Sequence, residues 1–245
     1  MTAMSLCQSF AKRISTELRR RDVGERAQHV TLSAGRLSAS ALGWPLQWQI
    51  LKALGHPGKD PDVYALAKFA RGKDVERFIL DVLKPPVTQQ ALDDGAIVGI
   101  LDAYWPDERC PVEVKSVSNM KYKRVVRQGG PDRSHALQAA WYGQALHTDE
   151  FCVLYVASDD YRVMSYVGQT ASFINDLRLI VATFQTQFAL GTVPTFQPLE
   201  KWHSMEQYNP YPDFVHFPGG RVDVPGICRL GPFGEFRSGP AVTAV

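Results

Sequence analysis

The sequence predicts an α/β protein with a mixed central sheet of about four or five strands and helices on both faces. Stretches with apolar residues at helical spacing alternate with short segments rich in β-branched and aromatic residues. Hydrophobic residues make up 45% and charged residues 21% of the 245 residues, which is typical of a folded chain and excludes a disordered one. One domain of this length is common, so we expect a single domain over residues 1–245, with its core at about 30–190.

Five helices are expected, each with apolar residues three or four positions apart. They span about 5–21, from Ser38 or Ser40 to about Gly55, about 61–83, about 133–147 and about 170–190. The first ends in three arginines, so it is either a packed amphipathic surface helix or a DNA-binding arm. Pro85 and Pro86 halt the third.

Four strands are expected where the apolar pattern changes period. They span residues 96–105, 111–117, 151–158 and 161–167. The polar turn at 106–109 separates the first two, which predicts a hairpin. After Gly191 the chain is rich in proline, glycine and aromatic residues, and we expect residues 191–245 to be irregular and to pack on the core.

Charge and cysteine content constrain the class of function. The net charge is only +2 and the pI is near 8.3, so nucleic-acid binding would depend on local clusters of basic residues. No apolar run reaches the roughly 18 residues of a membrane span and the N-terminus lacks a signal-peptide pattern, so we expect a cytoplasmic protein without a membrane partner. The four cysteines form no CxxC pair, so their spacing suggests neither zinc nor an iron–sulphur cluster.

The pattern that points to chemistry is Asp102 followed by Glu113-Val114-Lys115. Residues two apart share a face of a strand, so Glu113 and Lys115 should point the same way, and the hairpin can bring Asp102 beside Glu113. Two adjacent carboxylates repel unless a cation lies between them, and hard oxygen ligands suit Mg²⁺, with Mn²⁺ as a substitute. Lys115 would orient or deprotonate a water, or stabilise charge on a phosphate. A solvated ion pair on an edge strand explains these residues equally well.

Other polar residues lie near this pattern. His135, Gln138 and Tyr142 share one face of a helix, which could hold a phosphate or orient Lys115, or could be an ordinary helix face. The basic residues that flank the pattern could grip phosphates, or could form a solvated face. They are Arg71, Lys73, Lys121, Lys123, Arg124 and Arg127, with Tyr122 among them as a candidate for stacking on a base.

Four segments in order resemble the motif series of the RecB-like and lambda-exonuclease-like branch of the PD-(D/E)XK nuclease superfamily. They are Gly72–Glu76, Gly99–Asp102, Glu113–Lys115 and Gln138–Tyr142. The resemblance covers about residues 30–190 and implies a restriction-endonuclease-like core. It also implies catalytic roles for Asp102, Glu113, Lys115, Gln138 and Tyr142, and a metal site made by Glu76, Asp102, Glu113 and the main-chain carbonyl of Val114.

One segment departs from the family pattern. Around Trp44 the chain resembles the region where many RecB-like nucleases carry the first cysteine of an iron–sulphur cluster, but a tryptophan stands in that place. The C-terminal region contains only Cys228 instead of a group of cysteines. We therefore expect no iron–sulphur cluster, and a role for Trp44 as an aromatic core residue.

The expected function is Mg²⁺-dependent hydrolysis of DNA phosphodiester bonds by an exonuclease that acts at DNA ends. The resemblance implies a bacterial cell or a phage-infected host, a role in recombination or repair, and a ring-shaped homo-oligomer or a recombination partner protein. An endonuclease of the same fold and a non-catalytic DNA-binding protein on this fold are the alternatives. An enzyme of unrelated chemistry that uses Glu113 as a general base has no cofactor or substrate signature in the sequence.

Overall fold

The computed structural model describes residues 13–14, 16–22, 35–56, 58–192 and 237–238. Residues 13–14 and 16–22 are helical and are called the N-terminal helical segment below. The further elements are β1 (Leu37–Ser38), the 3-10 helix η1 (Ala39–Ala41), α2 (Leu46–Ala53), α3 (Val63–Leu83), β2 (Val87–Asp93), β3 (Ile97–Trp105), β4 (Cys110–Val117), α4 (Asn119–Gln128), α5 (Arg133–Ala145), β5 (Glu150–Ala157), β6 (Val163–Gln169), the 3-10 helix η2 (Thr170–Phe173), α6 (Ile174–Ala189) and β7 (Arg237–Ser238).

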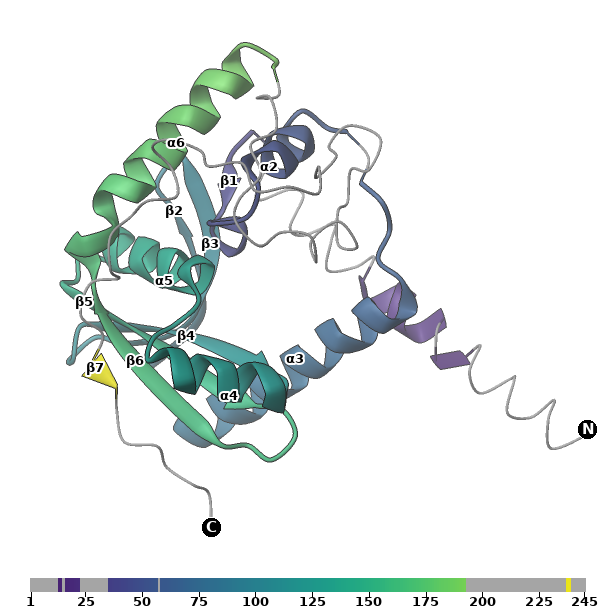
Figure 1. Ribbon diagram of the computed structural model, residues 1–245, viewed down its shortest axis with the longest axis vertical. Coiled ribbons are helices and arrows are strands. Elements are labelled where there is room, and N and C mark those ends of the chain that lie inside the picture. The colour runs from purple at the N-terminus through teal and green to yellow at the C-terminus, as the bar shows by residue number, and fades with distance from the viewer. Residues whose placement is uncertain (1–12, 15, 23–34, 57, 193–236, 239–245) are drawn as a thin grey trace, which may run out of the picture.

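A mixed sheet of seven strands runs through the centre of the described structure (Figure 1). Its order is β1-β3-β4-β5-β6-β7, and β2 also pairs with β3. The contacts β1–β3 and β4–β5 are parallel and the others are antiparallel. Because β1 and β7 have two residues each, five longer strands remain, and the prediction of a mixed sheet is confirmed.

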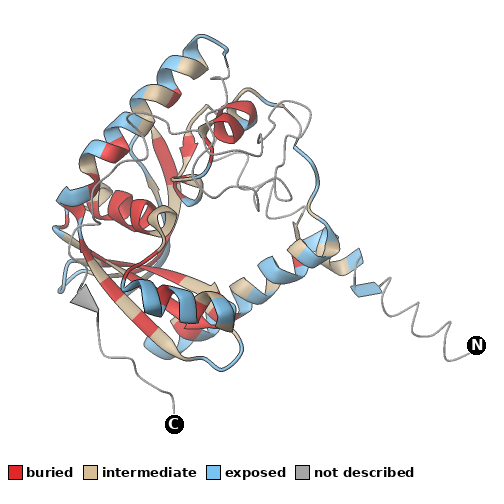
Figure 2. Cartoon of the chain, viewed as in Figure 1, coloured by how far each residue is buried: buried red, intermediate tan, exposed pale blue. Residues whose placement is uncertain are grey.

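Helices cover both faces of the sheet, as predicted. On one face Val75 and Ile79 of α3 pack against Val112 and Val114 of β4. On the other face a larger core joins α5 to residues of α2, α4 and α6. Figure 2 shows α5 buried along nearly its whole length, whereas α3 exposes much of its surface.

The helix α5 approaches the sheet closely because β3 carries a glycine. A Cβ atom on Gly99 would lie 2.6 Å from Cβ of Ala39 and 2.9 Å from the ring of Trp141. Such distances are far below van der Waals contact, so only glycine permits this packing. Gly99 therefore sets the distance between β3 and the α5 residues that reach the site described below.

The expected start of the second helix is wrong. After Ser38 the chain forms the short η1, which includes Ser40, and α2 begins only at Leu46. Pro45 occupies the N-cap position of α2, where a proline costs no hydrogen bond. Trp44 is 39% exposed and packs on Trp48 with ring centroids 5.7 Å apart, so it is not the core residue that we expected.

Among the longer elements, β2 and α4 were not predicted. The strand β2 was missed because most of its side chains are exposed, although Asp94-Gly95 after it is a turn sequence that marks a hairpin with β3. The helix α4 was also missed, because no helix was expected between 117 and 133. Its N-cap Ser118 accepts a hydrogen bond from the Lys121 N–H, and Gly129 ends it with a φ of 71°, which are ordinary helix boundary signals.

The remaining expectations agree with the described elements. The hairpin of β3 and β4, the strands β5 and β6, and the helices α3, α5 and α6 lie within a few residues of the predicted ranges. Most of the C-terminal segment 191–245 and the start of the first helix lie outside the described residues. No helix among the described residues is long and apolar enough to cross a membrane.

Candidate metal and nucleic-acid site

The site begins where β3 and β4 separate. Their ladder runs from Trp105–Cys110 to Ala103–Val112 and ends there, one pair before Asp102 and Glu113 would face each other. The carboxylate of Asp102 lies in the gap, where its Oδ2 accepts a hydrogen bond from the Val114 N–H at 2.8 Å. The Asp102 carboxylate thus accepts a main-chain N–H of β4 at a position where the β3–β4 ladder no longer provides a carbonyl.

Glu113 and Lys115 follow on β4. Glu113 is only 2% exposed, and its Oε1 forms an ion pair with Nζ of Lys115, whose side chain is 23% exposed. The second oxygen of Glu113, Oε2, is buried and has no hydrogen-bond partner. A buried carboxylate oxygen without a partner is costly, and a cation would offset that cost.

A chain of hydrogen bonds connects Lys115 to α5 and back to β3. Lys115 Nζ donates to Oε1 of Gln138 at 3.1 Å, and Nε2 of Gln138 donates to the hydroxyl of Tyr142 at 3.0 Å. The Tyr142 hydroxyl donates to the carbonyl of Ile100 at 2.6 Å. Both α5 side chains are buried, so they can orient Lys115 but cannot lie on a DNA surface.

Glu76 reaches the site from α3. Its Oε1 accepts a hydrogen bond from Nε2 of Gln89 at 2.9 Å, and Gln89 belongs to the unpredicted strand β2. Gln89 is therefore a site residue that sequence reasoning missed. The turn sequence after β2 was the signal that could have found the strand, although not the contact.

Burial and like charges shift the titration of these groups. Burial, reinforced by the charges of Glu113 and Glu76, raises the pKa of Asp102 well above its usual 3.8. Burial also raises the pKa of Glu113 and of Glu76. For Lys115, burial acts to lower the pKa, but the carboxylates of Glu113, Asp102 and Glu76 together raise it, so the ammonium form is favoured.

The residues present suit a hard divalent cation. Asp102 and Glu113 offer carboxylate oxygens, one of which is buried and unpartnered, and Mg²⁺ is commonly bound by one or two carboxylates that water and substrate phosphate complete. As the side chains stand, no group of three or more His, Cys, Asp or Glu among the described residues is arranged to hold a metal. Glu76, whose Oε1 is held by Gln89, would have to turn its Oε2 toward the pair to become a third ligand.

The fold was compared with known proteins. No family model matches the chain, and no curated protein sequence matches it significantly. Among solved structures, the alkaline exonuclease LHK-Exo from Laribacter hongkongensis has a TM-score of 0.54 at 13% identity, over 67% of this chain and 93% of that one. The chain is similar in fold to this exonuclease.

Two further solved structures are similar in fold to this chain. LHK-Exo in complex with dAMP has a TM-score of 0.52 at 13% identity, over 64% of this chain and 89% of that one. The structure of SSO0001 has a TM-score of 0.53 at 17% identity, over 83% of this chain and 96% of that one. The predicted restriction-endonuclease-like core is confirmed.

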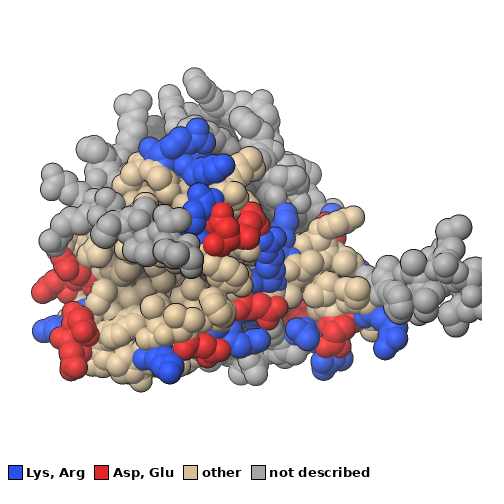
Figure 3. All heavy atoms as spheres, turned by 90° about the horizontal axis from the view of Figure 1, so that it is seen from below, with Lys and Arg blue, Asp and Glu red and all other residues tan. Residues whose placement is uncertain are grey.

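The helix α4 carries most of the basic residues singled out from the sequence. Lys123 and Arg127 are exposed, with Nε of Arg127 donating to the carbonyl of Lys123. Lys121 and Arg124 form ion pairs with Asp132 at 3.0 and 2.8 Å. Half of the basic residues of α4 are therefore neutralised in part by Asp132. Figure 3 shows basic and acidic side chains intermixed on one face of the molecule.

Tyr122 does not have the role that we expected. The residue is 5% exposed, its hydroxyl donates to the carbonyl of Val163 at 2.9 Å, and the guanidinium of Arg162 lies 5.1 Å from the centroid of its ring. A ring that is buried in this way cannot stack on a nucleic-acid base. Tyr122 instead anchors α4 to the start of β6.

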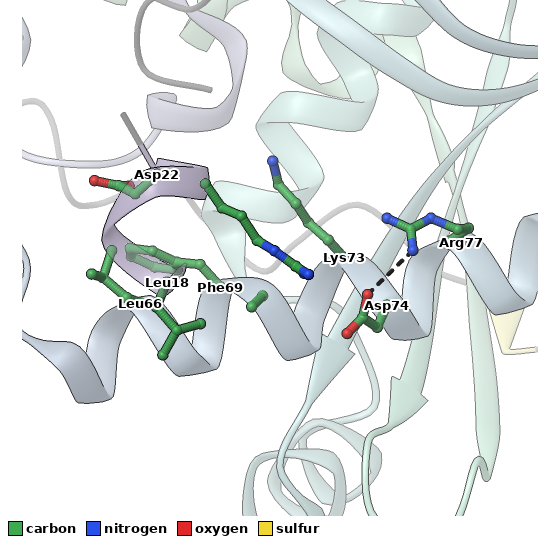
Figure 4. Close-up of a pocket in the computed structure, with 9 residues that line it drawn as sticks. Leu18, Asp22, Leu66, Phe69, Lys73, Asp74 and Arg77 are labelled. Atoms are coloured by element: carbon green, nitrogen blue, oxygen red, sulfur yellow. Dashed lines mark hydrogen bonds and ion pairs between the residues drawn. The ribbon is translucent and has the colours of Figure 1, made fainter. Parts of the chain in front are cut away.

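The two basic residues of α3 that the sequence singled out, Arg71 and Lys73, have different neighbours. Arg71 donates to the carbonyl of Ser158 and forms an ion pair with Asp159, so it ties α3 to the turn between β5 and β6. Lys73 lines a hollow between α3 and the N-terminal helical segment (Figure 4). Residues of both signs and apolar side chains line the rest of it: Leu18, Arg21, Asp22, Leu66, Phe69, Ala70, Asp74 and Arg77.

His135 is also less accessible than the sequence suggested. Its Nδ1 lies 2.7 Å from the hydroxyl of Tyr155, within hydrogen-bond distance. Burial, together with the charge of Lys115, lowers the pKa of His135 well below its usual 6.5. A neutral imidazole is a weak partner for phosphate, so the structure favours a packing role for His135 over contact with DNA.

Proposed function

We propose that this protein is a divalent-metal-dependent nuclease that hydrolyses DNA phosphodiester bonds. One observation carries the proposal. The ammonium of Lys115 is held by Glu113 and Gln138 next to two buried carboxyl groups, one of which has an unpartnered oxygen. An ordinary surface ion pair would not be buried and would not need a relay of hydrogen bonds to orient its lysine.

The residues of the site would have two roles, which are metal binding and stabilisation of charge on the phosphate. We propose Asp102, Glu113, the carbonyl of Val114 and, after a change of side-chain orientation, Glu76 as ligands of Mg²⁺ or Mn²⁺. The cation would supply an activated water and offset the charge of the scissile phosphate. Lys115, as an ammonium, would stabilise negative charge that develops on the phosphate oxygens, while Gln138 and Tyr142 hold Nζ in place.

The choice of DNA ends as substrate is part of the proposal. It is supported by the shared fold with an alkaline exonuclease, one structure of which is a complex with dAMP. Exposed Lys123 and Arg127 of α4, with Lys73 of α3, would contact the phosphate backbone. A ring-shaped homo-oligomer, a recombination partner and a cytoplasmic role in bacterial or phage recombination or repair complete the proposal.

Digestion of end-labelled linear DNA and closed circular DNA tests it. We expect Mg²⁺ or Mn²⁺ to support loss of linear DNA, EDTA to prevent it, and circular DNA to persist. Lys115→Ala should slow digestion by about 10²- to 10⁴-fold, whereas Lys68→Ala, which removes an exposed lysine of α3, should leave the rate unchanged.

Other outcomes would contradict parts of the proposal. Cleavage of the circle would replace the exonuclease by an endonuclease of the same fold. Wild-type protein that binds DNA without degrading it would favour the non-catalytic alternative. Lys115→Ala protein that digests DNA at the wild-type rate would remove the site assignment.

A further inference from the structure

Gln89 has an unusual backbone conformation at a position opposite the site. The β2–β3 ladder pairs Thr88 with Ala103 and Gln90 with Leu101, so Gln89 stands opposite Asp102. Its φ is 50°, in the left-handed region that side chains other than glycine, asparagine and aspartate rarely adopt. The strand β2 thus departs from regular geometry at the residue that stands opposite Asp102 in the ladder.

The side chain of Gln89 uses this conformation for one contact. Its Nε2 donates to Oε1 of Glu76 at 2.9 Å and so joins β2 to α3. Gln89 itself is exposed, so burial of apolar surface does not explain the strained backbone. Strained residues that persist in a structure cluster at functional sites, where the surrounding structure holds them.

The contact has a direct consequence for Glu76. A carboxylate has two oxygens, so a donor on Oε1 restricts the rotation of the group without occupying Oε2. Glu76 lies among the charges that act on Asp102, Glu113 and Lys115. Carboxylates that bind metals are themselves commonly held by hydrogen bonds from neighbouring residues.

We propose that Gln89 is a positioning residue: its bond to Oε1 keeps the Glu76 carboxylate near the Asp102–Glu113 pair while Oε2 is left to turn toward a cation, and this strengthens the binding of a divalent cation there. The inference rests on the proposed metal centre and adds to it a residue from a strand outside the four motif segments. Gln89 acts through Glu76 and touches neither the cation nor the substrate.

The test is calorimetric titration of Mn²⁺ into the full chain without DNA. Gln89→Ala and Gln89→Gly should each bind Mn²⁺ about 10-fold more weakly than wild type. Gln90→Ala is the matched control, because Gln90 is the adjacent exposed glutamine on β2 and pairs regularly with Leu101; it should bind Mn²⁺ as wild type does.

The variant Gln89→Gly distinguishes the effect of losing the side-chain amide from the effect of the strained backbone. Glycine adopts a φ of 50° without steric cost, so Gln89→Gly in EDTA should unfold at a temperature no lower than wild type. Its weaker metal binding then reports the lost amide and not a damaged fold. In digestion assays the Mg²⁺ concentration for half-maximal rate should rise about 10-fold, while the rate at saturating Mg²⁺ stays near wild type.

The failures are distinguishable. Wild-type affinity or tighter Mn²⁺ binding in Gln89→Gly would overturn the role of Gln89 and leave the metal centre standing. Wild-type protein that binds no Mn²⁺ would overturn the metal centre and the role of Gln89 together.

Discussion

The Val114 N–H donates to Oδ2 of Asp102 at 2.8 Å, at the point where β3 and β4 separate. This bond places a carboxylate between two strands of a sheet instead of on one of its faces. Glu113 precedes Val114, so the same divergence brings two buried carboxyl groups together. The site therefore depends on an interruption in the sheet as much as on its residues.

Asp102→Asn should stabilise the metal-free protein at alkaline pH. The folded state raises the pKa of Asp102 above 3.8, so it binds more protons than the unfolded state and loses stability as pH rises through that window. In urea unfolding with EDTA, Asp102→Asn should have a larger free energy of unfolding than wild type at pH 8, with a smaller difference near pH 4.

Asp107→Asn, in the exposed turn between β3 and β4, is the control and should show no such pH-dependent gain. Asparagine at 102 retains an oxygen that can accept the Val114 N–H. An Asp102→Asn protein that is less stable than wild type at pH 8 would contradict the unfavourable burial of this carboxylate.

Tyr142→Phe should lower both stability and activity. The variant leaves the Ile100 carbonyl without its donor and Nε2 of Gln138 without its acceptor, which costs about 1–3 kcal/mol of unfolding free energy. Looser positioning of Lys115 should reduce the digestion rate by about 10- to 100-fold at saturating Mg²⁺. Tyr104→Phe, on the same strand as Ile100, should change neither quantity; equal effects of both variants would argue against the relay.

Gly99→Ala should destabilise the fold. The added methyl group would meet Ala39 and the ring of Trp141, so α5 and η1 must shift away from β3. Overpacking of this kind costs about 1–3 kcal/mol. A thermal unfolding midpoint equal to that of wild type would show that α5 is not held closely against β3.

His135→Gln should reduce the loss of stability on acidification. The folded state lowers the pKa of His135, so the unfolded state binds more protons below pH 6.5 and stability falls as pH drops through that value. Urea unfolding at pH 7.5 and at pH 5.0 measures the loss. Between these two pH values the free energy of unfolding should fall more in the wild type than in His135→Gln. His147→Gln, at an exposed position, should follow the wild type.

Lys123→Ala and Arg127→Ala should weaken DNA binding with a smaller dependence on salt. Each removes one exposed cation of α4, so the slope of log affinity against log salt concentration should become shallower by about one. Fluorescence anisotropy of labelled DNA at several salt concentrations measures this slope. Lys59→Ala, an exposed lysine outside α4, should retain the wild-type slope, and unchanged slopes for both α4 variants would place the DNA elsewhere.

The sequence by itself determined the fold class and the principal site candidates. Period-two spacing placed Glu113 and Lys115 on one face, and helical spacing placed Gln138 and Tyr142 together on α5. These conclusions depend only on the geometry of a single strand or helix, which fixes the positions of residues close together in the chain. The accessibility of Tyr122 and His135 could not be read in this way, because burial depends on distant elements such as β5 and β6.

Only the tertiary structure decided how these residues meet. The separation of β3 from β4, which opens a place for the Asp102 carboxylate, depends on pairing between strands and leaves no period in the sequence. The contact of Gln89 with Glu76 joins β2, whose sequence pattern is weak, to α3. Gln89 has a positive φ, which a glycine at that position would have indicated but a glutamine does not. Contacts between distant segments are set by the packing of the whole sheet and its helices, so local sequence pattern does not specify them.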